Sequence, residues 1–570
     1  MKKETVVRPL LGAILALAVT AMLTMTVLAA GPYSITINGG DQKGMGGATR
    51  FTAYKIFKGE PKNFQGNHET LMGIEWGDGV TQDQLVAALK GSDLPVEGGT
   101  FGSKFTEAYN KWKGTHDSAI TEAELVAQFL SQHLTDTYAD DFARIVAGCV
   151  KGEGTKSTET GEGWEISGLA GGYYFVKDNY VSPEPDGQPD PAVSSYILRV
   201  VEDVSVPIKS SIPTVEKKVE GKDGYLAQIG QELTFTLTGT VAQNISEYET
   251  YSYKFTDTLS KGLDILNINR DDFSVKLGEH QFTKGTDYTA EVTNGEDGKH
   301  VLTVTFADLI AAAKNGKTTL NENSKIVVTY KAKLNGSAVA GGAGNPNDVK
   351  LEYSNDPYSD GKGESVPDEV KTYTLNLGIV KQSGDVEPKK LSGAKFKLKN
   401  AEGKYAKMEK QEGSSEENPV YSITGWADDE KDGSEITTGD GGTFTILGLT
   451  ASADPGTKYT IVETAAPDGY EKMQDIVFNI IGSVDDEKNG ALGTIALKRD
   501  SSNQNREDVQ FGGNMDDGSG SLTLINYSSP ILPNTGGIGA KVVYLVSGLA
   551  VLAGVCVVLA ARKKGREDKG

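Results

Sequence analysis

The sequence predicts a mainly β protein: three tandem β-sandwich domains, the first with helical insertions, followed by a C-terminal transmembrane helix. Short runs in which apolar and polar residues alternate recur along most of the chain, with Gly, Asn and Asp between them. Near the C-terminus stands one apolar run, residues 542–561, which is long enough to span a bilayer as a helix. Between the two predicted terminal signals lie about 500 residues, enough for roughly three domains of ordinary size.

Residues 1–30 are predicted to be a secretory signal peptide. Three basic residues near the start are followed by an apolar run that ends at Leu28, and small residues come next. This order is typical of a signal that is removed on secretion, and cleavage after Ala29 or Ala30 fits it.

Residues 31–210 are predicted to form an N-terminal domain that is rich in strands. Its middle portion looks helical, because Thr121 and Glu124 match a capping box before an apolar-periodic run, and residues 139–150 have a similar pattern. The strand patterns lie at residues 33–37, 51–57, 166–169, 173–176 and 197–206.

Residues 211–373 are predicted to form a middle β-sandwich domain, interrupted by one short helix at 307–314. Its clearest strand patterns lie at residues 233–238, 301–306 and 326–330.

Residues 374–527 are predicted to form the third domain. Its clearest strand patterns lie at residues 395–398, 442–446, 459–463 and 522–525. The polar run 500–519 is expected to be a surface loop or a flexible insertion.

The composition and charge exclude several classes of function. The net charge is −21, and the two terminal signals carry +2 and +4 of it, which leaves −27 on the part between them. Such an acidic surface argues against nucleic acid as a partner. The histidines are scattered without metal-ligand spacing, and no G-x-S-x-G, H-E-x-x-H or phosphate-loop motif occurs. We therefore expect no enzyme acting on other molecules, no cofactor and no metal.

The chain has two cysteines, Cys149 and Cys556, and the second lies inside the predicted membrane span. The secreted part therefore cannot form an intramolecular disulfide, so any covalent reinforcement must be of another kind. Cys149 has no neighbouring histidine to activate it, and we expect it to be a small buried core residue.

Residues 528–570 contain a pentapeptide, an apolar span and a basic end, in that order. The basic cluster after residue 561 would hold the tail at the cytoplasmic face. The arrangement resembles the LPxTG cell-wall sorting signal of Gram-positive bacteria. The alternative interpretation is an ordinary single-span membrane anchor. This resemblance implies that a sortase cysteine attacks the Thr535 carbonyl and passes the acyl group to an amine. The pentapeptide consists of Leu532, Pro533, Asn534, Thr535 and Gly536.

Motifs in the second and third segments resemble those of sortase-assembled backbone pilins. In the third segment, residues 378–381, 391–396, 463–470 and 525–526 resemble a Cna B-type immunoglobulin-like domain. In the second, residues 213–217, 255–263 and 347–355 resemble the middle domain of SpaA-type major pilins. The resemblance implies immunoglobulin-like, Cna-type sandwiches.

The resemblance also implies a self-forming Lys–Asn isopeptide bond between the first and last strands of such a domain. Burial disfavours the ammonium form of the lysine, and a nearby carboxyl can polarise the Asn amide and carry protons. In the third segment the matching residues are Lys381 as nucleophile, Asn526 as acceptor and Glu463 as the promoting carboxyl. The first segment offers no such trio, and we predict no bond there.

In the middle segment the corresponding residues are Lys217, the promoting carboxyl Asp257, and Asn347 as acceptor. Asn355 remains an alternative acceptor, because both asparagines flank the same predicted strand. Lys218 adjoins Lys217, but strand alternation lets only one of them face the core.

Polymerisation of a backbone pilin needs an acceptor lysine at the end of the first domain. The family motif resembles V-x-V-Y-P-K-N, and residues 203–210 only partly match it, because no Tyr precedes Pro207 and Ile208 comes before Lys209. Position nevertheless favours Lys209 as the acceptor, which would give a head-to-tail filament.

The sequence thus predicts the structural shaft subunit of a cell-surface pilus that supports adhesion. The implied partners are a pilin-specific and a housekeeping sortase, further copies of the chain, accessory pilins and peptidoglycan. The product would be secreted and anchored to the cell wall, from a membrane-tethered precursor. The alternative is a monomeric wall-anchored adhesin built from the same modules, which would need no acceptor at Lys209. A wall-anchored enzyme has no catalytic constellation to support it.

Overall fold

The computed structural model describes residues 33–64, 68–115, 119–133, 138–181, 189–209, 211–512, 515 and 517–528. The protein is mainly β, as predicted. The predicted signal peptide, sorting pentapeptide and membrane span lie outside the described residues. Within the described ranges, no helix is long and apolar enough to cross a membrane.

The chain divides into two compact units. One contains the described residues up to Leu375, together with 483–494 and 517–518, and the other contains the remaining described residues. The first unit therefore includes both the predicted N-terminal and middle segments. The boundary at residue 210 stays a prediction.

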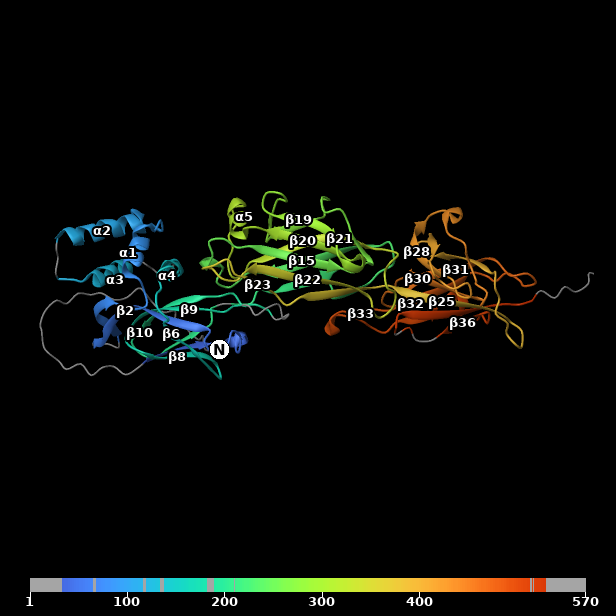
Figure 1. The fold of residues 1–570 in the computed structure, drawn as a ribbon. Helices are drawn as coiled ribbons and strands as arrows, with labels where there is room; N and C mark the ends of the chain where they lie inside the picture. The colour runs from blue at the N-terminus through green and yellow to red at the C-terminus, as the bar shows by residue number, and fades with distance from the viewer. Residues whose placement is uncertain are drawn as a thin grey trace, which may run out of the picture. The chain divides into compact units, whose positions relative to one another are not determined.

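Two sheets form the N-terminal part of the first unit (Figure 1). One has the order β11 (Val204–Pro207), β1 (Tyr33–Asn38), β8 (Gly163–Leu169), β7 (Thr158–Thr160). The other has the order β10 (Ser195–Val200), β9 (Gly172–Asp178), β2 (Phe51–Phe64), β3 (His68–Trp76), with β6 (Thr155–Lys156) beside β2. Between them lies a core that includes Ile35, Trp164 and Tyr174. Strand alternation explains this, since Tyr174 and Val176 face this core while Phe175 faces the other side.

Helices cover the second face of the β2–β9 sheet (Figure 1). They are α1 (Gln82–Lys90), α2 (Phe101–Thr115), α3 (Glu122–His133) and α4 (Ala139–Ala147), with the short pair β4 (Pro95–Val96) and β5 (Gly99–Thr100) between the first two. The predicted capping box is confirmed, because the backbone N–H of Thr121 donates to Glu124 Oε2 at 2.9 Å and that of Glu124 donates to Thr121 Oγ1 at 3.1 Å. Cys149 is a buried free thiol in the same core, as predicted.

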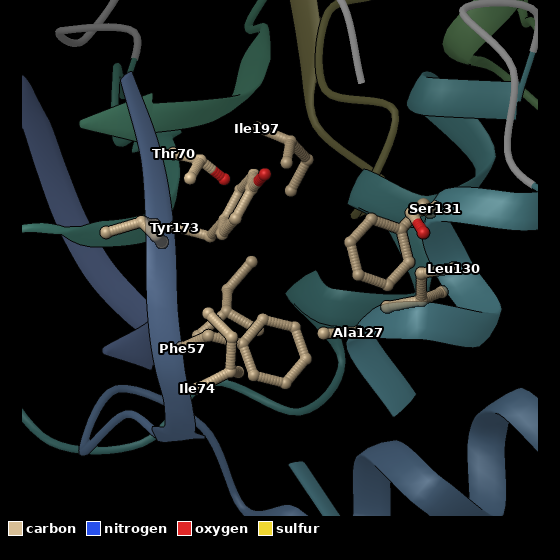
Figure 2. Close-up of a pocket in the computed structure, with 11 residues that line it drawn as sticks. Phe57, Thr70, Ile74, Ala127, Leu130, Ser131, Tyr173 and Ile197 are labelled. Atoms are coloured by element: carbon tan, nitrogen blue, oxygen red, sulfur yellow. The ribbon is translucent and has the colours of Figure 1, made fainter. Parts of the chain in front are cut away.

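A small, mostly apolar pocket lies between this sheet and the helices (Figure 2). Phe57, Ile74 and Leu130 form part of its wall, and Thr70 and Tyr173 add hydroxyl groups.

One buried ion pair lies at the end of the β2–β9 pairing where Phe51 stands opposite Asp178. The guanidinium of Arg50 donates twice to the Asp178 carboxylate, at 2.9 and 2.7 Å, and both side chains are fully buried. A third N–H contact reaches Gln42 Oε1 at 2.9 Å. The bidentate geometry and the additional hydrogen bond offset the free-energy cost of removing both charges from water.

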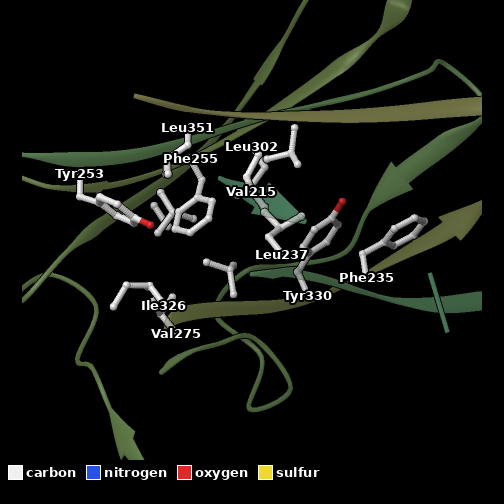
Figure 3. Close-up of a cluster of buried hydrophobic side chains, with 14 of the residues drawn as sticks. Val215, Phe235, Leu237, Tyr253, Phe255, Val275, Leu302, Ile326, Tyr330 and Leu351 are labelled. Carbon is white, nitrogen blue, oxygen red and sulfur yellow. The ribbon is translucent and has the colours of Figure 1, made fainter. Parts of the chain in front are cut away.

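The middle part of the first unit is a sandwich around one large core (Figure 3). One sheet has the order β12 (Val215–Val219), β14 (Glu232–Thr240), β21 (Lys325–Leu334), β17 (Ser274–Leu277), β18 (His280–Gln281), with β16 (Leu263–Ile265) on β21. The other has the order β13 (Gly224–Leu226), β24 (Asp368–Tyr373), β22 (Asn345–Ser354), β15 (Tyr253–Leu259), β20 (His300–Phe306), β19 (Thr289–Asn294), with β23 (Lys362–Glu364) on β22. The predicted short helix is α5 (Leu309–Asn315), which Asp308 caps.

The second unit is built from one long path of strands. Its order is β35 (Ala496–Arg499), β32 (Ile476–Ile481), β31 (Thr457–Ala465), β26 (Lys395–Lys399), β27 (Tyr405–Lys410), β28 (Val420–Ala427), β30 (Thr443–Leu449), β25 (Leu375–Ser383), β37 (Ser519–Asn526), β36 (Val509–Gly512), with β29 (Ile436–Thr437) on β26. The pairing of β25 with β37 is parallel and sets Ser383 opposite Asn526.

The expectation of a loop over 500–519 is wrong in part. Residues Val509–Gly512 form β36, an edge strand that pairs with β37 and buries Val509. Met515 is also fully buried. The polar residues around this short strand hid it, since four residues are too few to produce a clear alternation.

We predict that Arg50→Ala destabilises the first unit by about 3–5 kcal/mol, because it leaves the Asp178 carboxylate buried without its partner. Urea unfolding followed by tryptophan fluorescence would measure the loss, since Trp164 packs under Arg50. As a control, Lys58→Ala removes an exposed ion pair with Glu75 and should cost less than about 1 kcal/mol. Equal losses in the two variants would contradict the role assigned to Arg50.

Candidate functional site

Alternation along β12 decides which of the two adjacent lysines enters the core of the middle sandwich. Lys217 is fully buried opposite Leu237 of β14. Lys218 points to the other face and pairs with Asp223 at 2.6 Å. The strand period therefore separates two chemically identical side chains into a core amine and a surface amine.

Lys217 meets a carboxylate from the facing sheet. Its ammonium is ion-paired with Asp257 of β15, and neither side chain is exposed to solvent. Burial lowers the pKa of Lys217 and raises that of Asp257, while their mutual attraction opposes both shifts. Both shifts favour the neutral amine and the neutral acid relative to the same groups in water.

Of the two candidate acceptors, Asn347 lies in this cluster. It lies on β22, two positions from Val349, the residue that pairs with Asp257, and its Nδ2 donates to the Tyr330 hydroxyl at 2.8 Å. That hydroxyl is 3.4 Å from Lys217 Nζ. Asn355 lies past the end of β22, roughly 26 Å further along an extended chain, where its backbone bonds Gly361.

The middle segment differs from the expected strand order in one respect. Asn347 is not on the last strand, because β23 and β24 follow β22. The lysine and the asparagine still face each other across the sandwich, since β12 and β22 belong to opposite sheets.

The third segment brings its three predicted residues into direct contact. Lys381 Nζ donates to Asn526 Oδ1 and lies 3.2 Å from Glu463 Oε1. Asn526 Nδ2 in turn donates to both oxygens of Glu463, at 3.1 and 3.3 Å. All three side chains are buried, so one carboxylate bridges the amine and the amide in a dry site.

The strands explain this contact. Lys381 and Asn526 come from the parallel neighbours β25 and β37, two register positions apart on the same face. Glu463 comes from β31, and the backbone N–H of Met473 fixes its Oε2 at 2.7 Å. The Phe396 ring lies 5.6 Å from Lys381 Nζ and helps to exclude water.

Burial lowers the pKa of Lys381 to about 8, against the opposing attraction of Glu463. A substantial fraction of the amine is therefore neutral near physiological pH. A neutral amine beside an amide carbon, with a carboxylate on the amide nitrogen, has the groups needed for acyl transfer from nitrogen to nitrogen.

Lys209 lies at the end of the N-terminal part, after β11. Its side chain is 40% exposed, with Nζ 3.6 Å from Asp140 Oδ1 and 3.4 Å from the Ser195 carbonyl oxygen. Tyr196 contacts this lysine twice. Its hydroxyl accepts from the Lys209 backbone N–H at 3.0 Å, and its ring centroid lies 5.2 Å from Lys209 Nζ. The lysine is thus held in place but reachable from solvent.

Sequence reasoning missed Tyr330 and Met473. Burial alternates along β21, and Tyr330 is at one of the buried positions, so its burial could be predicted from the sequence. Its contact with Asn347 could not, because it depends on the facing sheet. The Met473 contact is through a backbone group, which leaves no signal in residue type. In the part of the chain that the structure describes, no group of three or more His, Cys, Asp or Glu could hold a metal.

Solved structures of pilins resemble this chain at low identity. The T6 backbone pilin of serotype M6 Streptococcus pyogenes is 16% identical, covers 88% of this chain and 100% of its own, and has a TM-score of 0.48. The full-length major pilin SpaD of Corynebacterium diphtheriae is 19% identical, with 88% and 98% covered and a TM-score of 0.44. BcpA, the major pilin subunit of Bacillus cereus, is 16% identical, covers 88% of this chain and 99% of its own, and has a TM-score of 0.36.

Two family models match parts of the middle and third segments, and Lys217 and Asn526 lie outside the matched residues. Residues 229–357 match the Gram-positive pilin backbone subunit 2, Cna-B-like domain, and residues 376–491 match the SpaA prealbumin-like fold domain. No curated protein matches the chain. The two matched domains confirm the family predicted from the motifs and place the chain among the backbone pilins of Gram-positive bacteria.

Proposed function

We propose that this chain is the shaft subunit of a covalently polymerised cell-surface pilus, stabilised by the internal isopeptide bonds Lys381–Asn526 and Lys217–Asn347. The observation that carries the proposal is the pair of buried lysine, asparagine and carboxyl clusters, one in the middle segment and one in the third, each of which is matched in part by a pilin family model.

In the third segment the neutral amine of Lys381 attacks Asn526 Cγ. The C–N bond forms, the bond to Nδ2 breaks, and the proton lost by the amine reaches the leaving nitrogen through Glu463, so ammonia departs. The short contacts support this step, because Glu463 touches both nitrogens that exchange the proton. Fixed proximity supplies much of the rate for a reaction that occurs once per molecule.

Such a bond has a mechanical consequence. Lys381 lies on the strand that opens the second unit, and Asn526 ends the last strand described in it. A pulling force then passes from β25 to β37 through a covalent link rather than through the hydrogen bonds of the sheet. This suits a secreted shaft that has no disulfide to carry the load.

Polymerisation would join Thr535 of one subunit to Lys209 of the next, by a pilin-specific sortase. The exposure of Lys209 and the nearby Asp140 carboxylate, which can take a proton from the amine, support this choice. A housekeeping sortase would transfer the finished fibre to peptidoglycan, with accessory pilins as further substrates. The precursor would be membrane-tethered until cleavage.

The intact mass of a recombinant Gly31–Thr535 chain tests the two bonds. Each bond releases one ammonia, about 17 Da, so we expect a deficit of two ammonias. Lys381→Ala and Lys217→Ala should each abolish one of them, whereas Lys218→Ala, which alters the surface neighbour, should abolish none. A full-length mass without any deficit would exclude both bonds.

The pH dependence of stability tests the state of Lys381. Asn526→Ala keeps this lysine unreacted, with a pKa of about 8 when folded against 10.5 when unfolded. The unfolded chain therefore binds more protons in this window, and stability rises with pH by roughly 2 kcal/mol between pH 7 and 9.5. Urea unfolding would measure it relative to the double variant Lys381→Met/Asn526→Ala. If the two variants show parallel profiles, Lys381 is not the titrating group.

Lys209→Arg tests the polymer linkage. Arginine keeps the charge but cannot act as an amine acceptor, so we expect the high-molecular-weight ladder to disappear in cells that express the pilin sortase. Lys156→Arg, an exposed lysine of the same part, should polymerise normally. A normal ladder from Lys209→Arg would show that another lysine is the acceptor. A wild-type protein that stays monomeric would favour the monomeric wall-anchored adhesin.

A further inference from the structure

The two clusters use carboxylates of different length. Glu463 reaches both Lys381 and the amide nitrogen of Asn526. Asp257 is one methylene shorter and is ion-paired with Lys217, while the Asn347 amide nitrogen donates elsewhere, to the Tyr330 hydroxyl at 2.8 Å. In the middle site a tyrosine therefore stands where the third site needs only its glutamate.

The Tyr330 hydroxyl is held at this point by packing. The residue is fully buried on β21, and its ring stacks on Phe235 with centroids 5.3 Å apart and planes 12° apart. Figure 3 shows the ring beside Phe235 with the hydroxyl at its free end. A stacked, buried ring leaves the oxygen few alternative positions.

The hydroxyl also stays protonated. Burial raises the pKa of Tyr330 well above its usual value, and the negative charge of the nearby Asp257 carboxyl raises it further. The Tyr330 oxygen accepts from Asn347 Nδ2 at 2.8 Å and lies 3.4 Å from Lys217 Nζ, which is itself ion-paired with Asp257, so the hydroxyl lies close to the amide nitrogen, the amine and the carboxyl. One O–H can thus donate on one side and accept on the other.

We propose that Tyr330 is the positioning residue and proton relay for bond formation between Lys217 and Asn347, a role that rests on the isopeptide chemistry proposed above. By accepting from Nδ2 it fixes the rotation of the amide and leaves Asn347 Cγ open to the Lys217 amine. Proton transfer within the ion pair first leaves a neutral Lys217 amine and a neutral Asp257 acid. As the amine attacks, the Tyr330 hydroxyl gives its proton to Nδ2 and regains one from Asp257, and Asp257 takes the proton that the amine loses.

The step is balanced without any other reactant. Lys217 Nζ gains a bond to Asn347 Cγ, Nδ2 loses its bond to the same carbon, and one proton moves from the amine to the leaving nitrogen. Ammonia leaves, and both Asp257 and Tyr330 return to their starting protonation states. A single relay of this kind contributes about 10²-fold or more to a rate.

The test is Tyr330→Phe in the Gly31–Thr535 chain, which removes one oxygen and keeps the stacked ring. Intact mass and mapping of the Lys217–Asn347 crosslinked peptide would follow the middle bond from purification over days at 37 °C. We expect it to form about 10²-fold more slowly than in the wild type, while the Lys381–Asn526 bond is complete in the same molecules.

Two variants separate this role from general packing. Tyr253→Phe removes another buried hydroxyl of the same core, which donates to the Thr240 carbonyl at 2.7 Å, and should leave the bond complete. Asp257→Glu combined with Tyr330→Phe should restore the bond, because the longer carboxylate fills the vacated space and reaches the amide as Glu463 does. If the double variant does not form the bond, Tyr330 does not act by bridging the gap between Asp257 and the Asn347 amide.

The outcomes distinguish the two proposals. A wild-type chain without the Lys217–Asn347 crosslink would overturn the proposed function for the middle domain. A wild-type crosslink that also forms at the normal rate in Tyr330→Phe would overturn the role of Tyr330 alone. Equal slowing in Tyr253→Phe would assign the effect to packing and overturn it as well.

Discussion

The burial of a lysine amine inside an apolar sandwich is the constraint on which the rest of this structure depends. A lone ammonium in such a place is strongly unfavourable, so the fold must supply a carboxylate or allow the amine to become neutral. Both happen here, since Lys217 and Lys381 each meet a buried acid and burial lowers the pKa of each. The same burial that makes the lysine ammonium costly favours its neutral amine, which is the form that the proposed reaction needs, and each cluster also contains an asparagine.

The N-terminal part solves the same problem of a buried cation in a different way. Arg50 is buried against Asp178 with a bidentate contact and further acceptors. A guanidinium stays charged and presents no free amine, so this pair stabilises by hydrogen bonds and cannot form an amide. The three segments therefore share a buried cation and carboxylate, but only two of them combine it with an amide and an amine that can react.

The two clusters place the groups of the proposed reaction on different strands. In the third segment the lysine and asparagine come from parallel neighbours, and a single glutamate spans both. In the middle segment they come from opposite sheets, the acid is shorter, and a tyrosine from β21 lies between acid and amide. The middle site thus contains one polar side chain more than the third site, and that side chain is Tyr330.

The sequence by itself determined the mainly β class, the order of the segments, and the identity of Lys381, Asn526 and Glu463 as partners, because strand alternation and short motifs are local patterns. The same alternation explains why Lys217 rather than Lys218 faces the core. Only the tertiary structure brought Asn347 rather than Asn355 to Lys217, revealed β36 inside a polar run, and put Tyr330 beside the amide. Those features depend on register and on the separation of facing sheets, which arise from contacts between residues far apart in the chain.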